Sequence, residues 1–372
     1  MTPRARYGKE GAGETMRAFN PRRLSLAAML LAAAALAACD RNAAKGGGEQ
    51  SVAQALDACG PQGGDGLLRQ LCGDEKLAAL NGQINQAIVA EAADVSGAGA
   101  QMLVQNQQRW LAAQRIACGV QDPDAQLNPD QTSCLESQMR ERVTEAQTAV
   151  EEKGGYTFQR VELIDAQAVT AEAAADSGLG EEAPPAITRE IRFPRIDGND
   201  SPQAARFNQL VAQQPQFRLE DQTEETVDYQ IAYAGPEIIS VRFNTYDYTL
   251  GAAHPNNGMR AVTVLMTTGQ PLAASDVFRA GSGWENFVTR RAMQSLTAQF
   301  RDYDFTPPQA DVRDSATKPH LWLVTEGGLV LLFPPYSFGG PHALGGAEVT
   351  IPWADLARYL NPNAPQPIRA PA

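Results

Sequence analysis

The chain has 372 residues, with 31 Lys and Arg against 43 Asp and Glu and a formal net charge of −12. This length allows about two domains with sizeable cores, and the acidic balance disfavours nucleic acid and favours cationic partners. Near the N terminus, Arg17, Arg22 and Arg23 precede an apolar run over residues 24–38. The run is too short to span a bilayer core and is typical of a secretory signal peptide, so residues 1–38 are not expected in the fold.

The apolar run ends in Leu-Ala-Ala before Cys39, which closely resembles the lipobox of bacterial lipoproteins. The resemblance implies that Cys39 becomes the acylated first residue, and several acyl chains anchor a protein stably. Asp40 resembles the inner-membrane retention signal of some Gram-negative lipoproteins. We therefore expect a lipid-anchored protein on the periplasmic side of the envelope, with the inner membrane favoured. The alternative is an ordinary signal peptide with a chance cysteine.

Removal of residues 1–38, which carry six Lys and Arg and two Asp and Glu, takes the net charge from −12 to about −16. Residues 39–52 have low complexity and predict a flexible tether.

Four cysteines follow, namely Cys59, Cys72, Cys118 and Cys134. An even number of cysteines in an exported chain predicts disulfides. Four cysteines allow three pairings, and the sequence does not select one. We favour Cys59 with Cys72 and Cys118 with Cys134, because each closes a short loop worth about 3 kcal/mol in the chain-entropy model. A zinc site is not favoured, because no pair has the usual Cys-x₂₋₄-Cys spacing.

Residues 53–152 predict three amphipathic helices that bury their apolar stripes against each other. The stripes are Leu77, Leu80, Ile84 and Ile88, then Leu103, Trp110 and Leu111, then Leu135, Met139, Val143 and Val150. Residues 119–132, rich in Pro, Asp and Asn, predict a polar loop between the second and third helices.

This cysteine-bearing region resembles the small helical domain of the LprI-type lysozyme-inhibitor family. The resemblance rests on Cys59 and on segments 71–81, 105–118 and 134–143, in particular a Gln-x-x-Trp-Leu segment running into a cysteine. It implies a domain of the lysozyme-inhibitor type. In the alternative interpretation, Trp110 and Leu135 are core residues, Arg115 and Arg142 are solvated helix arginines, and nothing is inhibited.

Residues 153–185 predict a linker, within which residues 156–163 fit a short strand. Candidate strands then cover residues 187–196, 227–234, 238–248, 260–266, 321–325, 329–333 and 347–351, and candidate helices cover 202–213, 282–299 and 353–360. Short turns between strands predict a mostly antiparallel sheet covered by helices on one face. The fold class is therefore α+β, with a disulfide-bonded three-helix module followed by an α+β domain over residues 186–362. Residues 363–372 are expected to be a disordered tail.

Segments 246–278 and 321–356 resemble the extracytoplasmic domain of the RsiV-type anti-sigma factors. The resemblance is carried by a Tyr-rich strand running into Gly-x-x-His-Pro and by a late strand-turn-strand that ends in Ile-Pro-Trp. It implies a domain that binds lysozyme. The residues expected to contact a partner are Tyr246, Asp247, Tyr248 and His254 around one loop and Tyr336, Phe338 and His342 around another. Alternatively, the aromatic residues belong to the core beside Gly-rich turns.

The usual signatures of an enzyme are not found. The three histidines form no His-Glu-x-x-His or similar ligand spacing, and no serine lies in a Gly-x-Ser-x-Gly turn. We expect no catalytic residues, no metal and no cofactor. The alternative joins Asp247, His254 and His342 in a metal or acid–base cluster.

The sequence is therefore compatible with three functions. The favoured one is that of a membrane-anchored protein that binds lysozyme-like muramidases and inhibits them by binding. The second is an envelope protein that binds peptidoglycan or another protein. The third is a metal-assisted hydrolase. The sequence does not indicate which muramidase is bound, which domain binds it, or the oligomeric state.

Overall fold

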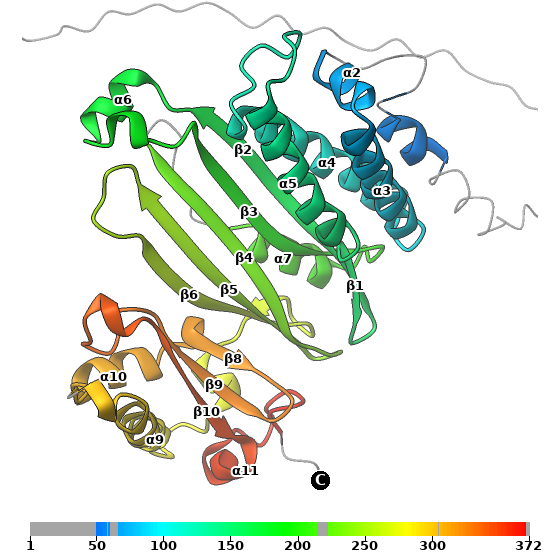
Figure 1. The fold of residues 1–372 in the computed structure, drawn as a ribbon. Coiled ribbons are helices and arrows are strands. Elements are labelled where there is room, and N and C mark those ends of the chain that lie inside the picture. Colours follow the sequence, from blue (N-terminus) through cyan, green and yellow to red (C-terminus); the bar gives the residue numbers. More distant parts are fainter. Residues whose placement is uncertain (1–49, 58, 60–65, 214–221, 304, 370–372) are drawn as a thin grey trace, which may run out of the picture. The chain divides into compact units, whose positions relative to one another are not determined.

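The computed structural model describes residues 50–57, 59, 66–213, 222–303 and 305–369, all within one unit, Arg41–Ala372. The predicted signal peptide, Cys39, Asp40 and most of the predicted tether lie outside these residues. The class is α+β (Figure 1). Among the described residues, no helix is both long and apolar enough to cross a bilayer.

A seven-stranded sheet in the order β1-β2-β3-β4-β5-β6-β7 is the centre of the fold. Its strands are β1 (Val150–Lys153), β2 (Tyr156–Ala168), β3 (Ala186–Asp197), β4 (Thr223–Ala234), β5 (Ile238–Thr249), β6 (Asn256–Leu265) and β7 (Gln270–Pro271). All neighbouring strands are antiparallel except β3 and β4, whose parallel pairing joins Ile191 to Val227. This parallel step requires a crossover, and α7 (Pro202–Val211) supplies it.

A second sheet of three strands has the order β10-β9-β8. Its strands are β8 (Trp322–Val324), β9 (Gly328–Phe333) and β10 (Ala347–Pro352), and β9 is buried along its whole length. One face packs on α8 (Ala274–Val277), α9 (Trp284–Gln299), α10 (Gln309–Ala316) and α11 (Trp353–Leu356). The other face, with Leu323, Val330 and Leu332, packs on Ala261 of the large sheet. Two sheets therefore replace the single sheet that we expected.

The large sheet is covered on both faces. Alternate residues of β3, β4 and β5, including Ile191, Val227 and Val241, pack on Phe207 of α7. The opposite face is shared by the three-stranded sheet and by α4 (Gly97–Ala117), which lies along β2 (Figure 1). The prediction of helices on one face only was wrong, because the intervening β2 brings the helical module onto the sheet.

The helical module consists of α2 (Gly66–Gly73), α3 (Glu75–Ala92), α4 and α5 (Pro129–Ala146). The predicted apolar stripes lie on α3, α4 and α5, except for Val150, which belongs to β1. Side-chain caps fix the helix starts. Asp74 accepts hydrogen bonds from the backbone N–H groups of Lys76 and Leu77 at 2.9 and 3.0 Å.

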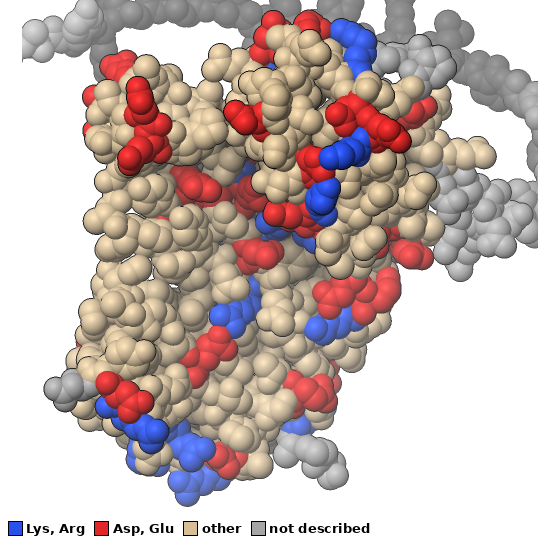
Figure 2. All heavy atoms as spheres, viewed as in Figure 1, with Lys and Arg blue, Asp and Glu red and all other residues tan. Residues whose placement is uncertain are grey.

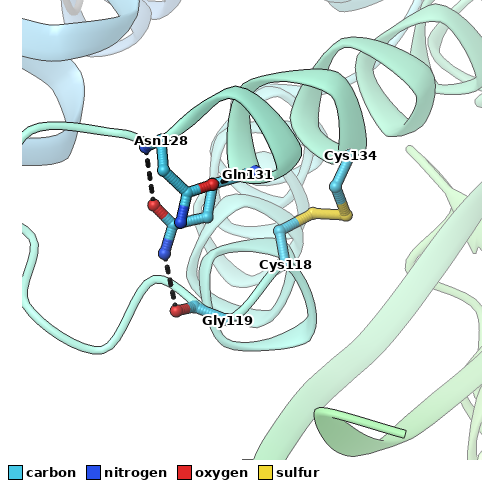
Figure 3. The surroundings of a disulfide bond; sticks show 5 residues. All are labelled: Cys118, Gly119, Asn128, Gln131 and Cys134. Carbon is cyan, nitrogen blue, oxygen red and sulfur yellow. Dashed lines mark hydrogen bonds between the residues drawn. A yellow bond between two sulfur atoms is a disulfide. The ribbon is translucent and has the colours of Figure 1, made fainter.

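Both disulfides have the local pairing that we favoured, Cys59–Cys72 and Cys118–Cys134. Beside the second one, Asn128 and Gln131 form a reciprocal capping box at the start of α5 (Figure 3). The Gln131 amide also donates to the Gly119 carbonyl at 2.8 Å, so one side chain joins the end of α4 to the start of α5.

Three segments expected to be mostly unstructured are ordered instead. Residues 153–185, expected as a linker with a short strand over 156–163, contain that strand as the longer β2, and also α6 (Ala171–Asp176) and a 3₁₀ turn at Gly180–Glu182. Residues 50–56, partly assigned to the tether, are helical, and Val52 is buried. The expected tail packs on the core through Ala364 and Ile368, both fully buried. The amino-acid composition of these segments was misleading, because a few buried apolar side chains are enough to hold a segment against the core.

Candidate binding site

The end of β5 carries the first group of predicted contact residues. Strand alternation places Tyr246 and Tyr248 on one face and Asp247 on the other, and all three are half-buried. Tyr248 lies opposite Glu224 on β4. Burial raises the pKa of the Tyr246 hydroxyl, and the carboxylate of Glu224 raises it further.

Two loops meet beyond this strand end and bring three predicted residues together. His254, between β5 and β6, stacks on His342, which opens the 3₁₀ turn His342–Leu344 between β9 and β10. The ring centroids are 4.2 Å apart, and the planes differ by 21°. Tyr336 leans on the same His342 ring at a centroid distance of 5.6 Å. We call His254, Tyr336 and His342 the histidine–tyrosine cluster.

Tyr336 is the most unusual member of this cluster. Its side chain is 53% exposed, and its φ of 67° lies in the left-handed region that only a few non-glycine residues adopt. Backbone bonds from Ser337 to Pro334 (3.1 Å) and from Gly339 to Tyr336 (3.0 Å) hold the turn. A costly backbone conformation therefore presents a large aromatic ring to solvent.

Phe338 does not belong to this surface, and its prediction as a partner contact was wrong. The side chain is fully buried and stacks on Phe300 with centroids 5.1 Å apart. Gly339 has a φ of 78° and passes so close to Pro308 that a Cβ atom would lie 2.6 Å from the proline ring. The turn therefore bends the loop inward after Tyr336 and buries the second aromatic residue.

The geometry does not join Asp247 to the two histidines. The Asp247 carboxylate accepts a hydrogen bond from the Asn256 amide at 2.9 Å, and the His254 Nδ1 atom lies 3.0 Å from the Pro255 carbonyl oxygen. Nε2 of His342 is buried, with no hydrogen-bond partner in the structure. Within the described part of the chain, no group of three or more His, Cys, Asp or Glu side chains is placed to hold a metal ion.

The helical module contains a second candidate region that sequence reasoning missed. Arg142 of α5 is only 3% exposed and forms an ion pair with the buried Glu162 of β2 at 2.8 Å. Its guanidinium carbon lies 5.5 Å from the centroid of the Trp110 ring, within the range of a cation–π contact. The alternative interpretation of Arg142 as a solvated helix arginine was therefore wrong. The other arginine, Arg115, donates to the carbonyls of Val120 and Gln121 at 3.0 and 3.3 Å.

More charges extend this contact between α5 and the large sheet. Arg160 pairs with Glu162 at 2.8 Å, and Arg192 pairs with both Glu145 and Glu190. Burial alone would raise the pKa of Glu162, but the guanidiniums of Arg142 and Arg160 outweigh it and lower the pKa to about 2. Glu162 is therefore a carboxylate at neutral pH. The signal in the sequence was the pair of opposite charges, Arg160 and Glu162, two residues apart on the predicted short strand.

Part of the C-terminal region matches a known family. Residues 275–354 match the family described as "Protein of unknown function (DUF3298)". This span includes Tyr336 and His342 and begins after Tyr246, Tyr248 and His254. No curated protein matches the chain.

Two solved structures of DUF3298 family proteins are similar to this chain. The one from Bacteroides fragilis NCTC 9343 has 13% identity and a TM-score of 0.42, and the match covers 57% of this chain and 96% of that chain. The one from Pseudomonas aeruginosa PAO1 has 14% identity and a TM-score of 0.40, and the match covers 56% of this chain and 96% of that one.

Proposed function

We propose that the protein is a lipid-anchored periplasmic protein that binds a cationic, lysozyme-like muramidase and thereby slows cell-wall lysis. The observation that carries the proposal is the exposed Tyr336 ring, supported by His342 and His254 on two joined loops. Exposed, rigidly held aromatic side chains are common carriers of interface energy. The resemblance of segments 246–278 and 321–356 to the RsiV-type domain supports lysozyme as the partner, and the LprI-type resemblance supports the inhibitor role.

Charge supports a cationic partner. The chain without residues 1–38 has a net charge of about −16, which increases the rate of encounter with a basic protein and weakens as salt screens the field. Figure 2 shows Asp and Glu side chains over α6, both signs of charge over the helical module, and Lys and Arg side chains gathered at the end that bears α9. Long-range attraction raises only the rate at which the two proteins meet. In this proposal, specificity for lysozyme comes from the loops that carry the histidine–tyrosine cluster.

The test uses the whole chain, because separate fragments of residues 50–152 and 186–372 would remove β2 from its pairing with β3. Binding of a C-type lysozyme is compared between the wild-type protein, Tyr336→Asn and the matched control Tyr303→Asn. Asparagine tolerates the left-handed backbone, so the first change removes the ring and keeps the turn. Tyr303 is the other large exposed apolar side chain among the described residues, at 66%.

We expect Tyr336→Asn to weaken lysozyme binding about tenfold or more and Tyr303→Asn to leave it unchanged. Cytochrome c serves as a basic protein that should bind weakly and equally to all three. Equal binding of lysozyme and cytochrome c, or no loss with Tyr336→Asn, would contradict the proposal. In a turbidity assay of cell-wall lysis, no effect on added lysozyme would favour the envelope-binding alternative. Lysis by the protein alone would favour a hydrolase.

The anchor is tested separately. Cys39→Ala removes the thiol that acylation requires, so the protein should move from the membrane fraction to the soluble periplasmic fraction. Continued sedimentation of Cys39→Ala with membranes would rule out this lipid anchor and leave the binding proposal intact.

A further inference from the structure

One stretch of the large sheet has an open edge. β1 pairs with β2 only along residues 156–159, and the last backbone bond on that side runs from the Arg160 N–H to the Ala149 carbonyl at 2.8 Å. Beyond this bond, side chains of α4 make the hydrogen bonds to β2 that a neighbouring strand would otherwise make. The Asn106 amide donates to the Arg160 carbonyl at 2.9 Å and accepts from the Glu162 N–H at 3.2 Å.

The next outward backbone groups along β2 belong to Ile164, Ala166 and Ala168. Strand alternation fixes this direction, because the outward groups of Glu162 and Arg160 lie two and four residues before Ile164. By the same alternation, the backbone groups of the intervening residues point toward β3, as at Asp165, which lies opposite Arg189. Within the described residues, no strand and no side chain bonds to the outward N–H and C=O groups of these three residues. Such a row of groups is a template for an added strand.

A cavity of about 550 Å³ lies beside this open edge. Ala166 and Ala168 line it on the strand side, and Ile116 and Val120 line it on the side of α4. Its volume is in the range of sites that hold a ligand, and the open edge of about five residues is about 17 Å long. The apolar walls suit small or apolar side chains of a chain that runs parallel to the strand.

The wall opposite the strand is fixed in advance. The Cys118–Cys134 disulfide and the bond from Gln131 to Gly119 hold the backbone where α4 ends and the wall begins (Figure 3). A wall held before the ligand arrives lowers the ordering cost of binding. The disulfide thus has a role in shaping a groove as well as in closing a loop.

Arg115 supplies the only charge among the residues that line this cavity. Its bonds to the carbonyls of Val120 and Gln121 place the half-buried guanidinium at the wall. Arginine is the preferred partner of carboxylates. We propose that the groove between α4 and β2 binds an extended peptide segment of a partner protein, which adds a strand to residues 164–168 and places a carboxylate at Arg115.

A short peptide fits the geometry better than a second copy of the large sheet. α4 lies along the same edge of β2, and its Asn106 and Arg109 side chains already form hydrogen bonds with the outward backbone groups of Arg160 and Glu162. The open stretch is therefore bounded at one end, and α4 forms a wall beside it. This site is distinct from the histidine–tyrosine cluster, and its test does not depend on the lysozyme proposal.

The experiment selects binders from a random octapeptide library with free C termini, using the immobilised full chain. Recovered peptides are then measured against Ala166→Pro, Arg115→Gln and the matched control Arg140→Gln, which changes an exposed arginine on α5 outside the groove. Proline at residue 166 removes an outward N–H and leaves the bonds to β3 in place. We expect at least a tenfold loss with Ala166→Pro, a several-fold loss with Arg115→Gln, and no change with Arg140→Gln.

Hydrogen exchange on the wild-type protein gives a readout that does not depend on the variants. The amides of Ile164, Ala166 and Ala168 should exchange faster than those of Leu163 and Asp165, and saturating peptide should slow them. The proposal is overturned if no peptide is enriched, if the bound peptide protects other amides, or if Ala166→Pro folds and binds normally. The proposal is also overturned if the protein forms a dimer as its concentration rises and the same amides are protected without peptide. In that case the edge of β2 would pair with a second copy of the protein.

Discussion

The helical module and the C-terminal lobe, defined as residues 274–356, pack on the same face of one sheet by different means. α5 meets β2 through buried charges, with Arg142 and Glu162 exposed by 3% and 1%. The three-stranded sheet meets β5 and β6 through buried apolar side chains such as Leu323 and Leu332. Its polar contacts there include a buried hydrogen bond from the Val324 N–H to the Ser240 hydroxyl and a partly exposed ion pair between Arg242 and Glu348. Buried ion pairs demand exact geometry but add little net stability, whereas apolar burial adds stability with little directionality. The difference suggests that charges fix how α5 lies on β2, while apolar burial stabilises the C-terminal lobe.

The largest effect is expected in the aromatic core of the C-terminal lobe. Phe338→Ala removes a fully buried ring that contacts Phe300, Phe305 and Phe333, and should lower the free energy of unfolding by about 4 kcal/mol. Urea denaturation measures this loss, with Tyr303→Ala as an exposed aromatic control that should change stability little. A loss below about 1 kcal/mol would place Phe338 outside the core.

The second effect concerns the charged contact of the helical module. Glu162→Gln leaves Arg142 and Arg160 without their shared carboxylate and should cost about 3 kcal/mol at pH 7. Glu136→Gln is the control on the same helix, because the Glu136 carboxylate is partly exposed and pairs with the exposed side chains of Arg140 and Lys76.

The same contact predicts a pH dependence. Because the pKa of Glu162 falls to about 2 in the folded protein, its ionisation stabilises the fold above the unfolded pKa of 4.5, and this contribution disappears as pH falls through 2. The difference in stability between wild type and Glu162→Gln should therefore shrink steadily from about pH 5 to about pH 2. A constant difference over that range would contradict the charged state of Glu162.

A smaller effect is expected from the second disulfide. Replacing both Cys118 and Cys134 by serine opens a loop with a sequence separation of 16 residues and should cost about 2–3 kcal/mol. Thermal unfolding measures the loss, and the Cys59–Cys72 pair replaced in the same way provides the comparison. Because Gln131 still joins Gly119 to α5, we expect the variant to fold. Failure to fold would make the disulfide essential to the module.

Sequence patterns predicted most helices and strands, because long apolar stripes and alternation report burial directly. The stripe of Leu77, Ile84 and Ile88 lies on α3, and the alternation over residues 238–248 lies on β5. The local disulfide pairing was also confirmed. α10 was missed, because its eight residues contain only Val312 as a large apolar side chain.

The candidate site was harder to predict, because it depends on contacts between distant segments. Nothing near His254 in the sequence indicates that its ring stacks on His342. Phe338 and Tyr336 are two residues apart in one loop, yet one is in the core and the other in solvent. Likewise, Arg142 is buried only because β2 brings Glu162 beneath α5.

The two outermost strands of the large sheet have a consequence for solubility. β1 is four residues long with Glu151 and Glu152 exposed, and β7 is two residues long and contains Pro271, which has no N–H to donate. Short, charged or proline-bearing edges resist pairing with the edges of neighbouring molecules. Edges of this kind would keep copies of the protein from joining edge to edge as its concentration rises.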